Sequence, residues 1–341
     1  MRALRYLGQH QLRLEELPEP VPGPGEVRIR PAAVGICGTD LHILDGTFAS
    51  RPPVILGHEV SGYIDAVGPG VLHAREGDLI TVEPHRFCGV CRYCRTGREH
   101  MCLLKEAYGV QLDGGMAEAQ IIPEKIAYKL PDGTDPRIGA LTEPLACCVH
   151  GMDRLNPKSG LGIVVFGAGP VGLMLIALSR LAGLTPIVSV ELSEARRTLA
   201  VAMGADCALD PDREDWTEQA QKLTGQAGFD YAIDAVGSPA ILTSAIDLAA
   251  RGAHILIFGV ADPGAGTTIR SQEIFAKELA ILGTAHNPYS HHRAAELLSR
   301  LGLDRLPVET FALEAHEEAF AAQGRRLVGK VQFGPQLRSA R

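Results

Sequence analysis

Four of the eight cysteines lie in one short segment, FCGVCRYCRTGREHMC, which covers residues 87–102. They are spaced as C-x2-C-x2-C-x7-C, at Cys88, Cys91, Cys94 and Cys102. Four thiolates at this spacing can enclose one zinc ion in a tetrahedron, and a closed tetrahedron leaves no position for a substrate. The segment therefore predicts a structural zinc site, with disulfide bonding as the alternative in an oxidising compartment.

A second, sparser set of metal-type ligands lies nearer the N-terminus. Cys37 stands in VGICGTDLH, and His58 and Glu59 adjoin each other in LGHEVSGYIDAVGPGV. Zinc enzymes commonly bind the ion through Cys, His and carboxylate side chains and leave one position for water or substrate. These residues by themselves do not distinguish such a site from a buried cysteine near a hydrogen-bonded core histidine.

A third motif has the chemistry of phosphate binding. After the apolar run LGIVVF comes GAGPVG, and a helix-like segment follows it. A strand, a tight glycine turn and a helix N-terminus together bring free backbone N–H groups close to a pyrophosphate. The candidate cofactor-binding residues of this motif are Gly167, Gly169, Pro170, Val171 and Gly172.

The next apolar run, PIVSV, is followed directly by Glu191, about 20 residues after the glycine motif. An acidic side chain there accepts hydrogen bonds from the adenosine ribose hydroxyls and repels a 2′-phosphate, so the sequence favours NAD over NADP. Arg196 and Arg197 complicate this interpretation, because an arginine near this strand end can also bind the 2′-phosphate of NADP. Their place in the following helix favours a position beside the adenine or in solvent, and Arg196 is retained as a candidate cofactor contact.

These motifs need a scaffold, and the chain divides into three stretches that provide one. Residues 1–150 contain short β-type runs punctuated by Gly and Pro, as in a loop-rich β domain. Residues 151–285 alternate apolar runs with helix-like segments, which favours βαβ units and a parallel sheet. Residues 286–341 mix helical and strand-like segments and could complete the first domain. The expected fold class is α/β.

Length and composition limit the class of protein. The 341 residues are 46% hydrophobic and 21% charged, which is typical of a globular chain of about two domains. The net charge of -7, with both signs interspersed, gives no basic surface for nucleic acid or anionic lipid. The N-terminus has no signal-peptide core, and no segment reaches about 18 consecutive apolar residues. We therefore expect a cytoplasmic protein that acts on a small molecule, with no membrane or nucleic-acid partner.

The segment GHEVSGYIDAVGPGV resembles the signature of the zinc-containing medium-chain dehydrogenase/reductase superfamily. CGTDLH, the four-cysteine segment, GAGPVG and the terminal VGKVQF fall in the order of that family, so the resemblance covers essentially the whole chain. It implies a GroES-like, β-rich catalytic domain over 1–150, with a structural-zinc lobe at 84–105. It also implies a doubly wound Rossmann domain over 151–285 and a C-terminal segment, 286–341, that completes the catalytic domain.

The resemblance assigns a catalytic zinc to Cys37, His58 and a carboxylate. Zinc with an open position lowers the pKa of an alcohol and orients the alkoxide, and hydride then passes to nicotinamide. Thr39 and His42 match the proton relay of the family, in which the threonine hydroxyl takes the substrate proton and the histidine passes it towards water. Asp40 matches the carboxylate that orients the ligand histidine, a role compatible with capping the N-terminus of the following helix.

The carboxylate ligand distinguishes the branches of the family. Glu143, in LTEPLACCVH, stands where other alcohol dehydrogenases have a second cysteine ligand, and this resembles the sorbitol and arabinitol dehydrogenase branch. We expect Glu59 to bind the zinc directly and Glu143 to bind it directly or through a water. The alternative is that Cys147 or Cys148 takes the role of Glu143.

The branch implies a substrate and an assembly. Polyol dehydrogenases oxidise a secondary alcohol of a sugar alcohol, such as sorbitol, xylitol or arabinitol, to the ketose with NAD as acceptor. L-threonine 3-dehydrogenase, sugar-phosphate dehydrogenase and a zinc- and nucleotide-binding protein without turnover are the alternatives. The sequence shows no evident charge pair for an amino acid and no basic cluster for a phosphate. Two zinc ions per chain are expected, in a homotetramer or, alternatively, a dimer that pairs edge strands around LAILGT.

Overall fold

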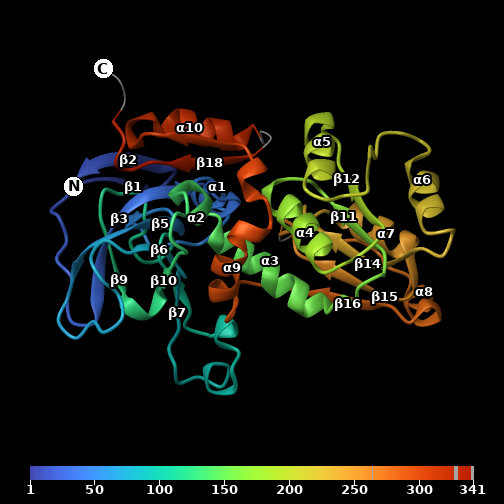
Figure 1. Ribbon diagram of the computed structural model, residues 1–341, viewed down its shortest axis with the longest axis horizontal. Helices are drawn as coiled ribbons and strands as arrows, with labels where there is room; N and C mark the ends of the chain where they lie inside the picture. Colours follow the sequence, from blue (N-terminus) through green and yellow to red (C-terminus); the bar gives the residue numbers. More distant parts are fainter. Residues whose placement is uncertain (263, 326–328, 339–341) are drawn as a thin grey trace. The chain divides into compact units, whose positions relative to one another are not determined.

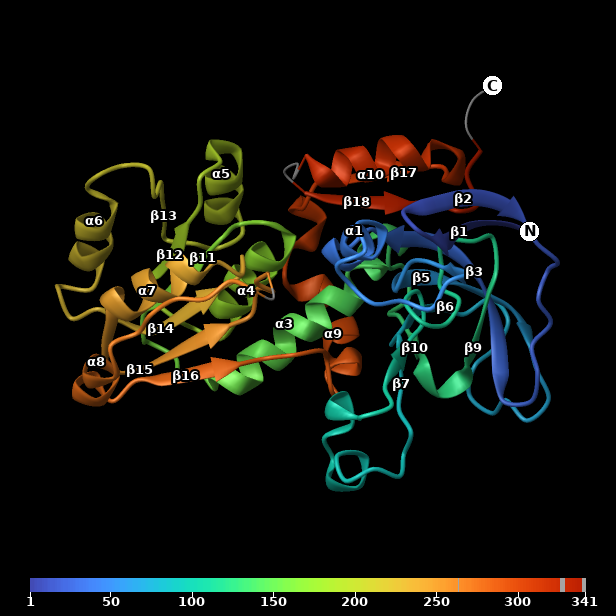
Figure 2. The ribbon, with the colours of Figure 1, turned by 180° about the vertical axis from the view of Figure 1, so that it is seen from behind.

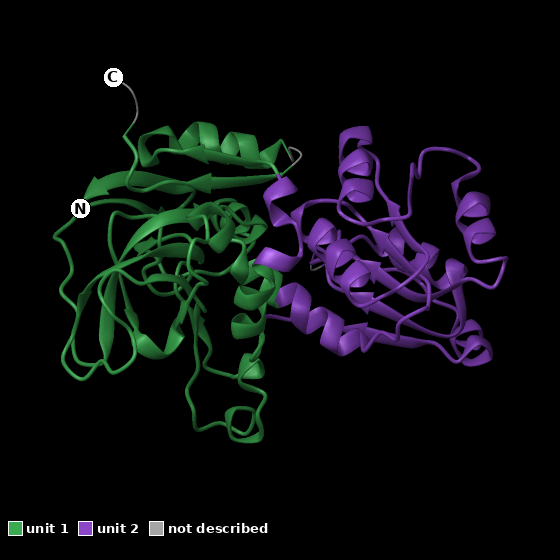
Figure 3. Cartoon of the chain, in the orientation of Figure 1, with its two compact units in different colours: residues 1–146, 287–298, 307–341 green, residues 147–286, 299–306 purple. Residues whose placement is uncertain are grey.

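A computed structural model describes residues 1–262, 264–325 and 329–338 of the chain. The chain forms two compact units, which Figure 3 draws in green and purple. Unit 1 comprises Met1–Ala146, Asn287–Leu298 and Pro307–Arg341, and unit 2 comprises Cys147–His286 and Ser299–Leu306. Each unit therefore collects segments that are far apart in the sequence.

The strands of unit 1 are β1 (Arg2–Gly8), β2 (Gln11–Glu16), β3 (Glu26–Gly35), β4 (Val54–Ile55), β5 (Glu59–Val67), β6 (Leu79–Val82), β7 (His85–Arg86), β8 (Glu106–Ala107), β9 (Gln120–Pro123), β10 (Ala127–Lys129), β17 (Val308–Phe311) and β18 (Lys330–Phe333). The largest sheet has the order β10-β6-β5-β3-β18-β17, with β9 also paired to β3, and the smaller sheets have the orders β2-β1-β4 and β7-β8. Buried and half-buried side chains alternate along most of β3, as expected for a strand with one face on a core.

The C-terminal part of the chain adds two strands to this sheet. β18 is antiparallel to β3, with Gln332 opposite Gly35, and parallel to β17, with Lys330 opposite Val308. Figures 1 and 2 show β18 (red) next to the blue N-terminal strands. The core of unit 1 accordingly contains side chains from both ends of the sequence. Val328, which belongs to the VGKVQF run, lies outside the described residues.

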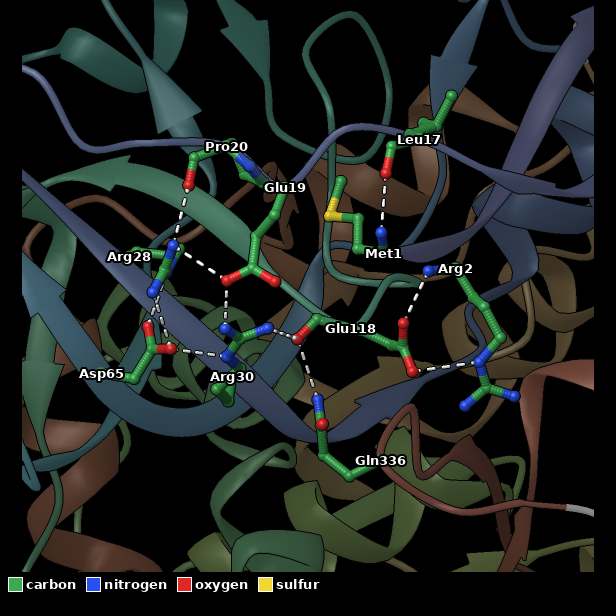
Figure 4. A network of polar contacts seen from close by, with 10 residues as sticks. All are labelled: Met1, Arg2, Leu17, Glu19, Pro20, Arg28, Arg30, Asp65, Glu118 and Gln336. Carbon is green, nitrogen blue, oxygen red and sulfur yellow. Dashed lines mark hydrogen bonds and ion pairs between the residues drawn. The ribbon is translucent and has the colours of Figure 1, made fainter.

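A polar clasp joins the first strand to the residues that follow β18 (Figure 4). The backbone N–H of Arg2 donates to Glu118 Oε2 at 2.6 Å, and Arg2 Nε donates to Glu118 Oε1 at 3.0 Å. Arg2 Nη2 also donates to the carbonyl of Leu337 at 3.1 Å, and Gln336 Nε2 donates to the carbonyl of Glu118 at 2.9 Å. The two ends of unit 1 are thus tied to the same glutamate.

Figure 4 also shows an ion-pair group on neighbouring strands β3 and β5. Arg28 Nε donates to Asp65 Oδ1 at 2.9 Å, and Arg28 Nη1 lies 2.9 Å from Glu19 Oε1. Arg30 pairs with the same two carboxylates. Because the glutamate side chain is 43% exposed, the arrangement aligns the strands more than it stabilises the unit.

Unit 2 contains one six-stranded parallel sheet in the order β13-β12-β11-β14-β15-β16. The strands are β11 (Ile163–Phe166), β12 (Ile187–Val190), β13 (Cys207–Leu209), β14 (Phe229–Asp234), β15 (Ala249–Ile257) and β16 (Ala280–Gly283). This is the strand order of a doubly wound dinucleotide-binding fold, so the predicted α/β class with a Rossmann sheet is confirmed. The sequence analysis did not identify β13, which is short and only partly buried.

The α-helices are α1 (Gly38–Leu44), α2 (Pro136–Gly139), α3 (Thr142–Leu155), α4 (Pro170–Leu181), α5 (Glu194–Ala202), α6 (Trp216–Leu223), α7 (Pro239–Leu248), α8 (Ser271–Lys277), α9 (His291–Leu297) and α10 (His316–Gly324). Short 3-10 helices occur at Cys94–Thr96, Glu99–Met101, Glu124–Ile126, Leu298–Arg300, Leu303–Arg305 and Leu313–Ala315. The sequence placed all of 286–341 with the first domain, whereas Ser299–Leu306 groups with unit 2. Arg305 Nη1 donates to the carbonyl of Ala202 at 2.8 Å within that unit.

None of the helices in the described part of the chain is both long enough and apolar enough to cross a membrane.

Candidate active site

Cys37, His58 and Glu59 come together in unit 1, and one possible ligand atom from each lies within 4.8 Å of the others. Cys37 stands at the N-cap of α1, and Glu59 is the first residue of β5, opposite Gly35 of β3. The tight turn before His58 needs Gly57, whose φ is 94° and whose Cβ would lie 2.7 Å from two neighbouring side chains. Strand register and a glycine turn therefore bring these three ligand types together.

Asp40 links the helix to the histidine. Its Oδ2 accepts a 2.8 Å hydrogen bond from the backbone N–H of Cys37, and its Oδ1 lies 3.6 Å from Nδ1 of His58. The expectation that Asp40 is the N-cap of this helix is wrong, because Cys37 holds that position and Asp40 is the third helical residue. Burial raises the pKa of the Asp40 carboxyl. Burial disfavours the charged imidazole, but Asp40, Cys37 and Glu143 together outweigh it and raise the pKa of His58 well above its usual value.

Lys330 is part of this cluster, although the sequence analysis did not identify it. Its Nζ lies 2.7 Å from Oε1 and 2.6 Å from Oε2 of Glu59, and both side chains are buried. Burial disfavours the charged amine, but Glu59, Cys37 and Asp40 together outweigh it and raise the pKa of Lys330. A lysine inside the largely apolar run VGKVQF is the sequence signal that could have indicated a buried charged partner.

Glu143 lies buried in the first turn of α3. Its Oε1 accepts a hydrogen bond of 3.4 Å from Nδ2 of Asn287, a buried residue that sequence reasoning missed. Burial raises the pKa of Glu143 to about 7, and its negative charge contributes to the raised pKa of His58. Of the two cysteines considered in its place, Cys148 points its thiol at the carbonyl of Val171 in unit 2, at 3.8 Å.

A second buried pair lies beside Asn287. Nδ1 of His85 is 2.6 Å from Oε1 of Glu83, and the amide of Asn287 also contacts the His85 ring. Burial raises the pKa of Glu83 to about 7 and lowers that of His85 to about 3. Asn287 thus joins the Glu83–His85 pair to Glu143 in one buried polar row.

The two candidate relay residues lie on α1. Oγ1 of Thr39 is 3.7 Å from the sulfur of Cys37, in the first turn of the helix. His42 is half exposed, and its Nδ1 lies 3.1 Å from Oγ1 of Thr47 and 3.5 Å from Asp45. The helix therefore leads from the metal-type cluster towards solvent.

The four cysteines of the lobe also converge. Their sulfurs lie within 4.8 Å of one another, and the Sγ–Sγ distances are 3.6 Å for Cys91–Cys94 and 3.9 Å for Cys88–Cys94. These distances exceed the roughly 2.05 Å of a disulfide bond, and all eight cysteines are free. Backbone N–H groups lower the pKa of Cys88 and bring that of Cys91 to about 6, while desolvation raises that of Cys94 to about 12.

Both groups fit zinc by their donor chemistry. Four sulfurs form a closed tetrahedral set, which suits a structural ion. One sulfur, one imidazole and one carboxylate leave the fourth coordination position of a tetrahedral ion open to water or substrate, which suits a reactive ion. In the second set Nδ1 of His58 lies 3.6 Å from Asp40, which leaves the other ring nitrogen for an ion, and Glu59 lies beside the buried ammonium of Lys330.

In unit 2 the glycine motif forms the turn between β11 and α4. Gly167 has a φ of 92°, and a Cβ at Gly172 would lie 2.0 Å from the carbonyl oxygen of Gly167. Gly169 is the N-cap of α4 without a side-chain cap, and Pro170 and Val171 begin the helix. The open helix N-terminus and the close backbone approach are the features that bind a pyrophosphate.

Glu191 stands at the end of β12 beside this turn. Its Oε2 accepts a hydrogen bond of 2.8 Å from the N–H of Ala168, and Nη1 of Arg196 lies 3.9 Å away. Arg197 donates to backbone carbonyls and pairs with Asp210 at 3.0 Å. Arg197 is therefore engaged within the unit, and Arg196 is the arginine nearest the Glu191 carboxylate.

Two family models match the chain. The alcohol dehydrogenase GroES-like domain model matches residues 23–132, and the zinc-binding dehydrogenase model matches residues 170–301. The four-cysteine lobe and the Cys37 cluster fall in the first match, and the end of the glycine motif with Glu191 falls in the second.

Similar proteins extend over nearly the whole chain. L-threonine 3-dehydrogenase of Pyrococcus horikoshii is 34% identical over 329 residues, which is 94% of this chain and 94% of that protein. D-arabinitol dehydrogenase 1 of Uromyces fabae is 31% identical over 340 residues, which is 98% of this chain and 97% of that protein. A solved structure described as a zinc-binding dehydrogenase of Sinorhizobium meliloti, with NADP bound, superposes with a TM-score of 0.93 at 34% identity. That similarity covers 98% of this chain and 99% of the other.

Proposed function

Because the chain belongs to the zinc-containing medium-chain dehydrogenase/reductase superfamily and is an NAD(P)-dependent alcohol dehydrogenase, we propose that it oxidises a secondary alcohol of a polyol to the ketose. The observation that carries this proposal is the cluster of Cys37, His58 and Glu59, of which His58 and Glu59 are buried, with Glu143 nearby. It supplies three ligand types to one ion and places a carboxyl group with a pKa of about 7 close to them.

The residues of unit 1 bind, orient and move protons in this proposal. Zinc held by the cluster would supply the positive charge that lowers the pKa of a substrate alcohol. Asp40, close to Nδ1 of His58, orients the imidazole so that the other ring nitrogen can face the ion. Thr39 takes the hydroxyl proton, and His42, at the exposed part of the same helix, passes it to solvent. Glu143 can exchange a proton near neutral pH.

The charges around the cluster favour a neutral substrate. Its buried cation, Lys330, is held by Glu59, and the other buried ionisable side chains near it include Asp40 and Glu143. A polyol has no charge that needs a fixed partner, whereas the carboxylate of an amino acid does. L-threonine is nevertheless the second candidate, because L-threonine 3-dehydrogenases are among the most similar relatives.

NAD is the proposed acceptor, in preference to NADP. Glu191 is held by the glycine turn and can accept hydrogen bonds from ribose hydroxyls, and its charge disfavours a 2′-phosphate. The similar structure from Sinorhizobium meliloti has NADP bound, so NADP is the alternative acceptor. The preference for NAD therefore requires that Glu191 repel a 2′-phosphate more strongly than Arg196 attracts it. Nη1 of Arg196 lies 3.9 Å from Oε2 of Glu191.

We further propose two zinc ions per chain and a homotetramer, with a dimer as the alternative. β16 is the last strand of the unit 2 sheet, so one of its edges is available to pair with a second copy. The eight free cysteines fit a reducing compartment such as the cytoplasm.

A substrate panel tests the proposed reaction. The zinc-loaded chain is assayed for NADH and NADPH formation with sorbitol, xylitol, arabinitol and L-threonine, and Glu191→Gln serves as the matched cofactor variant. We expect turnover on a polyol with NAD, and a smaller preference for NAD over NADP in the variant. Turnover on L-threonine alone would favour the second candidate, and no turnover on any secondary alcohol would overturn the proposal.

A further inference from the structure

A buried ion pair stands directly beside the proposed metal ligands. Nζ of Lys330 lies 2.7 Å and 2.6 Å from the two carboxylate oxygens of Glu59, and the side chains are 7% and 1% exposed. A buried pair at this distance is expensive to break, because either charge left alone would be buried without a partner. The partners are 271 positions apart in the sequence, so the pair depends on the folded sheet.

The backbone around the pair holds the lysine in place. Lys330 is the first residue of β18, and its N–H donates to the carbonyl of Pro307 at 2.9 Å. The N–H of Ile36 donates to the carbonyl of Val331 at 2.9 Å, which ties β18 to the segment that leads to Cys37. The backbone of Lys330 is therefore fixed beside β3, and its side chain is buried with the ammonium against Glu59.

Gly35 gives the pair its space. A Cβ at this position would lie 1.9 Å from Oε2 of Glu59 and 3.0 Å from Cε of Lys330. Gly35 is directly opposite Glu59 in the β3–β5 pairing, so an ordinary side chain at that register position would displace the carboxylate. The strand thus accommodates the ion pair by having no side chain there.

Both carboxylate oxygens of Glu59 lie beside the same ammonium group. Oε1 accepts a hydrogen bond from Lys330 at 2.7 Å, and Oε2 lies 2.6 Å from Nζ, so the lysine engages the whole carboxylate. A carboxylate oxygen approaches zinc to about 2.0–2.2 Å, and the charge of Lys330 opposes this by neutralising Glu59 and repelling the ion. Lysine and metal ion therefore compete for one carboxylate.

We propose that Lys330 is a positioning residue that competes with the metal ion for Glu59 and keeps Glu59 a weak, exchangeable ligand. The inference rests on the proposed function, because it takes Cys37, His58 and Glu59 as the metal centre. An exchangeable carboxylate can leave its position when a substrate oxygen arrives, while the thiolate and the imidazole keep the ion bound.

Metal affinity of the full chain tests this role without relying on turnover. Zinc is removed by titration with a chromogenic chelator from wild type, Lys330→Met, Glu59→Gln and the double variant. We expect the ion of the Cys37 cluster to bind about tenfold more tightly in Lys330→Met, because Glu59 is released to it, and more weakly in Glu59→Gln. In the double variant the lysine substitution should have no further effect, since it acts through Glu59.

The lobe ion is the internal control, because its four cysteines do not contact this pair and its release should be unchanged. Co²⁺ in place of zinc gives a second readout: its visible spectrum should change in Lys330→Met as a carboxylate becomes a firm ligand. If Lys330→Met does not fold, Lys330→Gln removes the same charge and should change affinity in the same direction.

The outcomes separate this inference from the proposed function. A role limited to folding predicts lower stability with unchanged or weaker zinc binding in both lysine variants, and that result would overturn the inference alone. If the Cys37→Ser variant retains the full zinc content of wild type, the cluster does not hold an ion, and that result would overturn both.

Discussion

The four-cysteine lobe and the Cys37 cluster assemble metal ligands in opposite ways. The lobe takes all four cysteines from residues 88–102, so local spacing is enough to bring the sulfurs together. The cluster takes Cys37 from a helix N-cap and Glu59 from a strand, and Lys330 reaches it from the last strand of the sheet. The lobe thus forms a closed set of four sulfurs from local sequence alone. The Cys37 cluster forms only when the strands pair, and the same pairing brings a buried cation, Lys330, to one of its ligands.

Removing one ligand from each group is the clearest test of the difference between the Cys37 cluster and the lobe. Cys37→Ser should lower turnover about a thousandfold, because several kcal/mol of charge stabilisation are lost, while the melting temperature changes little. Steady-state kinetics, thermal unfolding and zinc content measure this, and zinc should fall from two ions to one. A variant that keeps full turnover would show that the reactive ion is held elsewhere.

Cys91→Ser should have the opposite profile. Loss of the lobe ion should lower the melting temperature by about 10 °C, because the binding free energy of a structural zinc contributes to folding. Turnover per folded molecule should stay near the wild-type value, measured after removal of aggregates. Loss of turnover in a fully folded and stable Cys91→Ser protein would contradict the structural role.

Glu83 directly follows β6, in the segment that leads into the four-cysteine lobe, and it allows the stability of this segment to be tested against pH. Its folded-state pKa of about 7 is raised by burial, so its contribution to stability is present below about pH 4.5 and is lost as pH rises through 7. Glu83→Gln should therefore gain about 3 kcal/mol in unfolding free energy relative to wild type between pH 4.5 and 8. Urea unfolding at both ends of this range measures the change.

Glu124 provides a matched control with the opposite sign. Its pKa is lowered by the backbone N–H groups of His73, Ala74 and Leu72, so its contribution is present above its unfolded pKa and is lost as pH falls. Glu124→Gln should become less stable relative to wild type as pH rises. The same slope in both variants would show that neither carboxyl is responsible.

The smallest expected effect is that of Glu143→Gln. Turnover should fall about tenfold to a hundredfold, because a group that exchanges protons beside the cluster is replaced by a neutral amide. Zinc content distinguishes the two possible roles: two retained ions indicate action through water, and loss of one indicates direct binding. Full activity together with full zinc content would exclude both roles.

The sequence predicted most where ligands are local and least where they meet across the fold. The cysteine spacing and the glycine turn can be read directly, because each function is completed within about 25 residues. The link between Lys330 and Glu59 could not be predicted, because it depends on the pairing of β18 with β3. Asn287 was missed for the same reason: it contacts Glu143, but residues 147–286 of unit 2 lie between them in the sequence.

The late position of β18 also has a consequence for biosynthesis. A ribosome releases the chain from the N-terminus onward, so Cys37, His58 and Glu59 emerge long before Lys330 and the residues that form the clasp with Arg2. The nascent unit 1 lacks both β18 and the buried cation beside Glu59 until all of unit 2 has been synthesised. The four-cysteine lobe, by contrast, can take up its ion while the rest of the chain is still being made.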